Sequence, residues 1–134
     1  MSVALDTNVL VRLLTRDDVA QCAAAAALVA AAAEVGAPAM LSLGVMLETE
    51  WVLRSRYKVA PAKIQQAFAA ILETHELVVE RPEVLEEALK LWRDWPGADF
   101  ADCMHVATAV RDDRILATFD QGAARLPGAA LVQR

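Results

Sequence analysis

The feature that most constrains the fold is a regular alternation of short apolar segments with longer segments of helical pattern. Five apolar segments are predicted to be strands, at residues 3–5, 39–42, 76–80, 114–120 and 130–133. Six segments between and around them are predicted to be helices, at about 7–14, 18–34, 44–56, 61–73, 82–93 and 99–111. Strands that alternate with helices favour a parallel sheet covered by helices on both faces, which is an α/β fold.

The length and composition predict one domain in a reducing compartment. The 134 residues can bury a real core, and no linker or internal repeat divides them, so we expect residues 1–134 to form a single domain. The long apolar run at 22–33 is shorter than the ~20 residues that span a bilayer. The N-terminus lacks a signal-peptide pattern, and Cys22 and Cys103 lack the spacing of metal ligands or of a disulfide framework. We therefore expect a cytoplasmic protein without a membrane segment.

Two acids follow predicted strands that lie at opposite ends of the chain. Asp6 comes directly after residues 3–5, and Asp120 ends the strand at 114–120. The carboxyl ends of parallel strands meet at one edge of a sheet, where ligands bind in α/β folds. Two carboxylates placed there would repel each other unless a cation or a proton compensated. Each acid could instead be an ordinary helix N-cap, but the pair together favours a functional site.

Two further acids lie three residues apart at the start of the last predicted helix. Asp99 can serve as the N-cap of that helix, and Asp102 lies in an otherwise apolar stretch where its solvation would be poor. We therefore expect Asp102 to be functional and leave open whether Asp99 acts beyond capping. Acids grouped with no other ligand type suit Mg²⁺ or Mn²⁺, which prefer oxygen ligands.

The helix at 44–56 offers either Glu48 or Glu50 to such a site, but not both. Residues two apart on a helix face nearly opposite ways. We favour Glu48 as the inward acid, because Arg54 lies four residues after Glu50 and provides a surface partner for it.

Four motifs occur in an order that is typical of one family. They are LDTNVLVRLL, LETEWVLRSRY, GADFADCMHVATA, and LATFD followed by ARLPG. With these motifs the chain resembles, over essentially its whole length, a PIN-domain ribonuclease of the VapC kind, the toxin half of a bacterial toxin–antitoxin pair. The resemblance implies a three-layer α/β/α sandwich with a central parallel β-sheet. It also implies an acidic pocket that holds Mg²⁺ or Mn²⁺ and cleaves single-stranded RNA regions into products with 5′-phosphate and 3′-hydroxyl ends.

The resemblance carries the family's site residues onto matching positions of this sequence. Five acids are expected to bind the metal: Asp6, Glu48, Asp99, Asp102 and Asp120. All except Asp99 are also expected to be catalytic, and Asp99 would reach the metal directly or through water. Asn8 and Thr118 match polar positions that support the carboxylates. The implied reaction is phosphodiester hydrolysis, in which one or two divalent cations activate a water and stabilise charge on the phosphate.

The charge and the apolar content shape the expected partners. A net charge of −5 argues against a sequence-independent nucleic-acid coat, so RNA contacts must come from local basic groups. The candidates are Arg12, Arg16, Arg54, Arg56, Lys58 and Arg114.

With 57% hydrophobic residues, we expect apolar patches on the helices at 44–53 and 64–72, which a homodimer would cover. An antitoxin that lays a helix into an apolar groove is the second expected partner.

Two alternatives belong to other functional classes. A haloacid-dehalogenase-like phosphatase also has a nucleophilic aspartate after its first strand, but it needs a second aspartate two positions later, where this chain has Asn8. A trapped aspartyl-phosphate would support that alternative. A non-catalytic nucleic-acid-binding PIN relative is expected to have lost acids, whereas all four main positions are filled here. Failure to bind a divalent metal would favour it.

Overall fold

The helix boundaries follow the capping residues that the sequence provides. The computed structural model describes residues 2–134. Its helices are α1 (Thr7–Thr15), α2 (Val19–Glu34), α3 (Leu43–Ser55), α4 (Pro61–Glu73), α5 (Pro82–Asp94) and α6 (Phe100–Arg111). The side chains of Asp6, Asp18, Ser42 and Asp99 accept hydrogen bonds from backbone N–H groups in the first turns of α1, α2, α3 and α6. The two remaining helices begin at prolines, which are favoured in the first turn.

The strands are shorter than predicted, and they pair in parallel. They are β1 (Ala39–Leu41), β2 (Leu77–Val79), β3 (Leu116–Thr118) and β4 (Ala129–Leu131), with a 3₁₀ helix η1 (Ala123–Arg125) before β4. β1 pairs with β2, and β3 pairs with β4. The strand expected at residues 3–5 is reduced to an isolated parallel bridge between Ala4 and Met40, because only two backbone hydrogen bonds of 2.9 Å flank that bridge.

The chain divides into two compact units, Met1–Pro82 and Glu83–Arg134. The parallel pairing predicted from the sequence is confirmed, but the central sheet is found as two pairs, β1–β2 in the first unit and β3–β4 in the second. A single domain over residues 1–134 stays a prediction.

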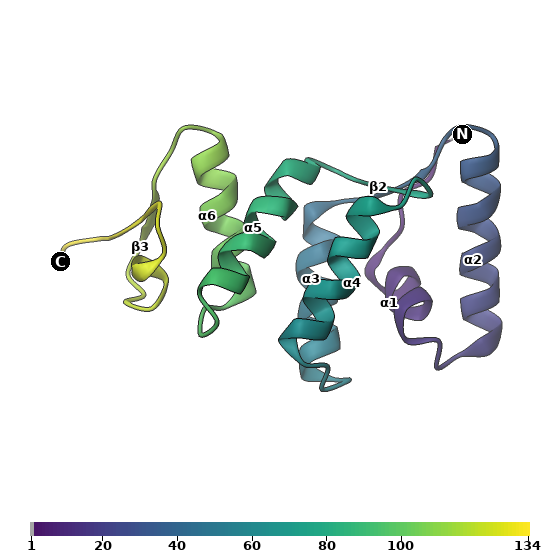
Figure 1. Ribbon diagram of the computed structural model, residues 1–134, viewed down its shortest axis with the longest axis horizontal. Helices are drawn as coiled ribbons and strands as arrows, with labels where there is room; N and C mark the ends of the chain where they lie inside the picture. The colour runs from purple at the N-terminus through teal and green to yellow at the C-terminus, as the bar shows by residue number, and fades with distance from the viewer. Residues whose placement is uncertain (1) are drawn as a thin grey trace. The chain divides into compact units, whose positions relative to one another are not determined.

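In the first unit α1 packs against α2 and α3, and α3 lies beside α4 (Figure 1). Ile64, Phe68 and Ile71 of α4 are buried because the helical repeat puts them on one face. The expectation of apolar patches on residues 44–53 and 64–72 is therefore wrong in the main: on these helices the large exposed apolar side chain is Trp51.

Helix α2 instead leaves much of its apolar run in solvent. Only Ala25 and Val29 of its side chains are buried, whereas Val19 and Leu28 are exposed. Among the described residues, none of the helices combines the length and the apolar character needed to cross a bilayer.

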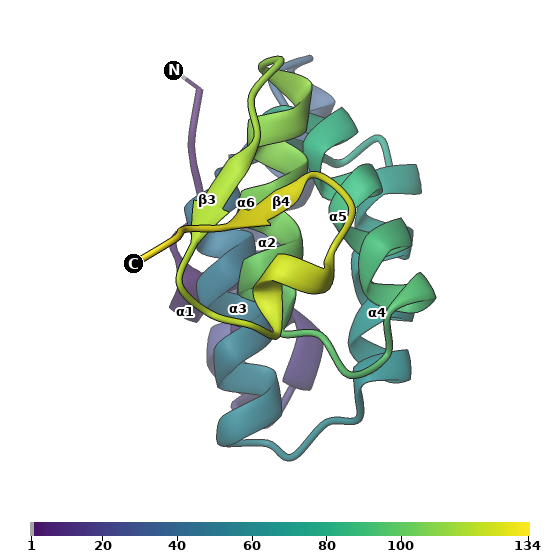
Figure 2. The ribbon, with the colours of Figure 1, turned by 90° about the vertical axis from the view of Figure 1, so that its left-hand side faces the viewer.

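The second unit packs its strands against α6. β3 and β4 lie side by side next to η1 (Figure 2), and β3 contacts α6. The rings of Trp92 on α5 and Phe100 on α6 lie with centroids 4.9 Å apart. Gly128, just before β4, has φ +98°, and a Cβ atom there would meet the side chains of Val106 and Val110 on α6. β4 therefore approaches α6 closely only because residue 128 has no side chain.

Candidate functional site

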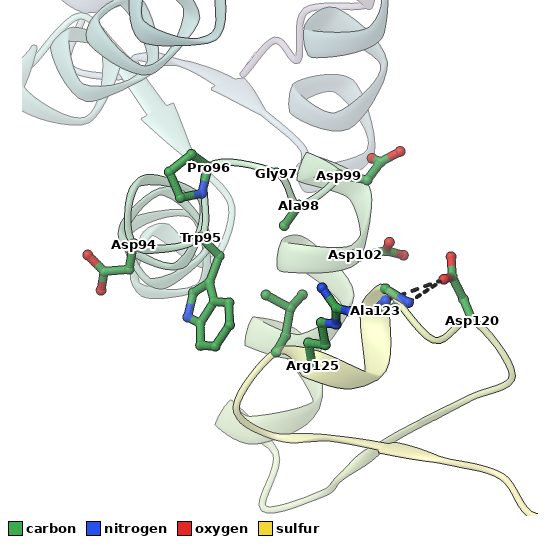
Figure 3. Close-up of a pocket in the computed structure, with 12 residues that line it drawn as sticks. Asp94, Trp95, Pro96, Gly97, Ala98, Asp99, Asp102, Asp120, Ala123 and Arg125 are labelled. Carbon is green, nitrogen blue, oxygen red and sulfur yellow. Dashed lines mark hydrogen bonds between the residues drawn. The ribbon is translucent and has the colours of Figure 1, made fainter.

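Four acids and one cation line a single pocket of the second unit. They are Asp94, Asp99, Asp102, Asp120 and Arg125, and the pocket has a volume of about 390 Å³. Figure 3 shows the carboxylates of Asp102 and Asp120 facing the same space beside α6, with the indole of Trp95 on another wall. Acidic, cationic and aromatic groups thus share one cavity.

Local hydrogen bonds position Asp99 and Asp120. Asp99 caps α6, and its Oδ1 accepts a hydrogen bond from the backbone N–H of Ala101 at 2.8 Å. Oδ1 of Asp120 accepts from the N–H groups of Gly122 at 2.8 Å and Ala123 at 3.4 Å (Figure 3). Within residues 2–134 the Oδ2 atoms of these two acids make no hydrogen bond. Capping therefore uses one oxygen of each carboxylate and leaves the other available for a ligand.

Thr118 acts on the chain next to Asp120 and does not touch its carboxylate. Its Oγ1 accepts a hydrogen bond from the backbone N–H of Asp120 at 3.0 Å. This bond fixes the turn after β3 and hence the direction in which the aspartate side chain leaves the strand. Support of the carboxylates by Thr118 stays a prediction.

The fold changes the acidity of Asp102. Burial raises the pKa of its carboxyl above the ordinary value of 3.8, and the charges of Asp99 and Asp120 raise it further, while His105 opposes them. Burial, with the charges of Asp102 and Asp99, also raises the pKa of the Cys103 thiol to about 12. Cys103 is fully buried and stays a thiol, so it is not a candidate nucleophile. A cation in the pocket would relieve the repulsion among the acids.

The first unit holds the other two candidate acids and connects them through Thr7. Asp6 caps α1 by accepting a hydrogen bond from the N–H of Val9 at 3.1 Å. The next residue, Thr7, is buried, and its hydroxyl donates a hydrogen bond to Oε1 of Glu48. Asn8 is exposed and lines a second pocket together with Asp6. Thr7 thus ties Glu48 to the segment that carries Asp6.

A family model described as PIN domain matches residues 3–129. The chain belongs to the PIN domain family. PIN domains are generally metal-dependent nucleases, and the α/β PIN-like fold with parallel strands that the sequence predicts is confirmed. No curated protein matches the chain.

In this PIN domain the surroundings of Glu48 and Glu50 differ from those predicted. Glu50 is buried, with 2% of its surface exposed, and its Oε2 accepts a hydrogen bond from Nε of Arg54 at 2.8 Å. Glu48 is exposed, so the prediction that it is the inward acid of this helix is wrong. The partner of Glu50 was predicted correctly, but its place at the surface was not, because α3 turns its Thr49–Glu50 face inward. Glu48 remains the candidate ligand through its bond to Thr7.

Most basic candidates of the PIN domain are engaged with neighbouring groups. Arg54 pairs with Glu50, the guanidinium of Arg56 lies 5.9 Å from the ring centroid of Trp51, and Lys58 donates to the carbonyl of Ser55. Arg12 is bound by Asp17, Gln21 and Tyr57. Arg16 and Arg114 are exposed. Arg12 lines a pocket together with the candidate acid Asp6.

Sequence reasoning missed three residues of the candidate site. Thr7 lies inside the DTN motif, and a hydroxyl between two candidate polar residues was the available signal. Arg125 lies in the ARLPG motif, which was noted without a role. Trp95 opens the WPGAD loop, and nothing in its spacing pointed to a pocket.

The donor chemistry of the PIN domain fits a hard divalent cation. All five candidate ligands are carboxylates, which suit Mg²⁺ or Mn²⁺. Burial is the main cause that raises the pKa of Asp102, and the charges of Asp99 and Asp120 add to it. Within the described part of the chain, no three His, Cys, Asp or Glu side chains are gathered closely enough to hold a metal ion. Asp94, Asp99, Asp102 and Asp120 line one pocket, and the three candidate ligands among them would have to draw closer together to hold a cation in the second unit.

Proposed function

We propose that this PIN domain is a divalent-metal-dependent endoribonuclease and that it acts as the toxin of a VapBC-type toxin–antitoxin pair. The observation that carries the proposal is one pocket that Asp99, Asp102, Asp120 and Arg125 line together. The negative charges of Asp99 and Asp120 both act on the carboxyl of Asp102. A pocket of acids alone would repel a phosphodiester. A cation held by the acids, with Arg125 beside it, turns the same pocket into a phosphate site.

The residues of the pocket divide the work of phosphodiester hydrolysis. Bound Mg²⁺ or Mn²⁺ would supply Lewis-acid stabilisation of the phosphate and a water of lowered pKa. Asp102 would hold the cation, and the hydrogen bonds from Gly122 and Ala123 would keep Asp120 oriented toward it. Arg125 would hold a phosphate oxygen with its planar guanidinium.

The exposed indole of Trp95 supports a single-stranded substrate. It lines the same pocket and is 40% exposed. Bases of single-stranded RNA stack on such rings, and one stacked base contributes about 1–3 kcal/mol to binding. A duplex keeps its bases stacked inside and could not use this ring.

The proposed reaction also uses Asp6 and Glu48. The order of the DTN, LETEW, DFAD and TFD motifs supports their inclusion, and Thr7 keeps Glu48 beside the Asp6 segment. Asn8 would support Asp6, whose pocket it lines. If only the acids of the second unit mattered, substitutions at Asp6 would leave cleavage unchanged.

A homodimer, an antitoxin and a cytoplasmic location complete the proposal. The exposed apolar side chains of Val19 and Leu28 on α2 and of Val35 just after it support protein partners in general. Sedimentation of the purified chain at micromolar concentration tests the dimer, and a monomer would contradict it.

The decisive experiment is RNA cleavage by the purified chain with Mg²⁺ or Mn²⁺, mapped by sequencing the fragment ends. Asp6→Asn and Asp102→Asn should each reduce cleavage by at least about 10- to 100-fold, the loss seen when even an outer partner of a metal ligand is removed. EDTA should abolish cleavage. Asp113→Asn is the matched control, because Asp113 is exposed outside the pocket and has φ +57°, which asparagine adopts readily.

Cleavage that survives both EDTA and the Asp102 substitution would come from a contaminant or from another chemistry. A protein that binds Mn²⁺ and leaves all RNA intact would overturn the nuclease proposal, and a trapped aspartyl-phosphate would then support the phosphatase alternative.

A further inference from the structure

A second pocket of the first unit lies beside Asp6 and is built differently from the acidic one. It has a volume of about 370 Å³, within the range of pockets that hold small ligands. Residues of α1 and α2 line it. Asn8, Arg12 and Gln21 provide its polar groups, and Leu28 with neighbouring alanines of α2 provides an apolar wall.

Three acceptors fix the guanidinium of Arg12 in this pocket. Its Nε donates to Oε1 of Gln21 at 2.6 Å, and its Nη1 donates to the hydroxyl of Tyr57 at 3.2 Å and to Asp17 at 3.4 Å. The bond to Oε1 also orients the amide of Gln21. In the described chain, Nη2 of Arg12 and Nε2 of Gln21 have no hydrogen-bond partner. Two donor groups are thus held next to each other and remain available.

The charge of the pocket favours a neutral ligand over a phosphate. The hydrogen bond from Tyr57, at 2.8 Å, is the main cause that lowers the pKa of Asp17, so Asp17 stays ionised and neutralises Arg12. Asp6 adds a further negative charge to the same pocket. A phosphate would meet net negative charge, so the expectation that Arg12 is a phosphate contact loses its support. A neutral group with acceptors on one edge and a flat apolar face would fit.

We propose that this pocket binds a guanine base of the RNA substrate. Guanine presents two adjacent acceptors, O6 and N7, to which Nη2 of Arg12 and Nε2 of Gln21 donate. Adenine places an amino group at the O6 position, and pyrimidines lack the acceptor pair. The face of the base lies on the apolar wall that includes Leu28. The inference rests on the proposed ribonuclease function, in which Asp6, a residue of this pocket, takes part.

The test compares the cut sites of the wild type and of Gln21→Glu on a random single-stranded RNA. Glutamate keeps the acceptor for Nε of Arg12 and removes the donor that the base needs. The wild type should favour guanine at one fixed position near the cut, and Gln21→Glu should weaken that preference by about 5- to 150-fold, the range of one bidentate base contact. Gln66→Glu, at an exposed glutamine of α4 outside the pocket, should cut as the wild type does.

Equal guanine preference in Gln21→Glu and Gln66→Glu, or no base preference in the wild type, would overturn the inference while leaving the nuclease intact. A titration that needs no cleavage separates the two failures. Guanosine, but not cytidine, should shift the side-chain amide resonance of Gln21 in an NMR spectrum. Equal effects of both nucleosides would refute the base pocket. This outcome covers the alternative in which the pocket binds a protein helix instead of a base.

Discussion

Replacing Gly128 by alanine tests how closely β4 must approach the helix that carries Asp102. The residue has φ +98°, where L-residues are strained. An added Cβ would lie 2.6 Å from Cγ2 of Val110 and 3.1 Å from Cγ1 of Val106. Both valines belong to α6, and Val106 is buried, so the helix or the strand must move.

Two effects set the magnitude. The backbone strain of a side chain at this φ costs about 1–3 kcal/mol, and an extra methyl group in a packed core costs about 1–3 kcal/mol. Gly128→Ala should therefore lower the free energy of unfolding by about 2–6 kcal/mol. Gly36→Ala isolates the first effect, because Gly36 has φ +76° and no heavy atom within 4 Å of the added carbon. Its cost should be about 1–3 kcal/mol, the strain alone.

Urea denaturation followed by circular dichroism measures both variants under the same conditions. Gly128→Ala should unfold at a clearly lower urea concentration than Gly36→Ala. Metal-dependent cleavage by the surviving folded protein should also fall, because displacing β4 also disturbs β3, its partner, which ends just before Asp120. Free energies that agree within about 0.5 kcal/mol would show that α6 and β4 are not packed as closely as the structure has them.

Two further predictions concern the acidic pocket. Asp102→Asn should raise the free energy of unfolding at pH 7 by about 0.5–1 kcal/mol. The pKa of Asp102 is raised in the fold, so the wild type loses stability as the pH rises above 3.8. The stability gained by Asp102→Asn should therefore vanish below pH 3.8. An equal gain at about pH 3 and pH 7 would contradict the raised pKa as its cause. Trp95→Ala should weaken binding of a single-stranded RNA to a cleavage-deficient variant by about 5- to 150-fold. Trp51→Ala, at a residue that is 50% exposed outside the acidic pocket, should leave binding unchanged, and equal losses would refute the stacking role.

The helices could be predicted closely because their start signals are local. A capping side chain such as Asp18 or Ser42 contacts the N–H three residues later, so sequence neighbours decide where the helix begins. The strands were harder, since a strand exists only where a second segment pairs with it. Residues 3–5 have strand character, yet they form only one bridge, to Met40. Their pairing depends on residues far away in the chain.

The sequence by itself determined the types of chemical group that the protein can use. The order of its motifs predicted the PIN family, and the family match over residues 3–129 agrees with that prediction, while the assignment of the acids stays a prediction. The tertiary structure alone decided the surroundings of each group. Glu48 and Glu50 are the same residue type on the same helix. The packing of α3 buries Glu50 beside Arg54, whereas Glu48 accepts a hydrogen bond from Thr7. Periodicity separates the two faces of a helix, but only the packed neighbours decide which face meets the core.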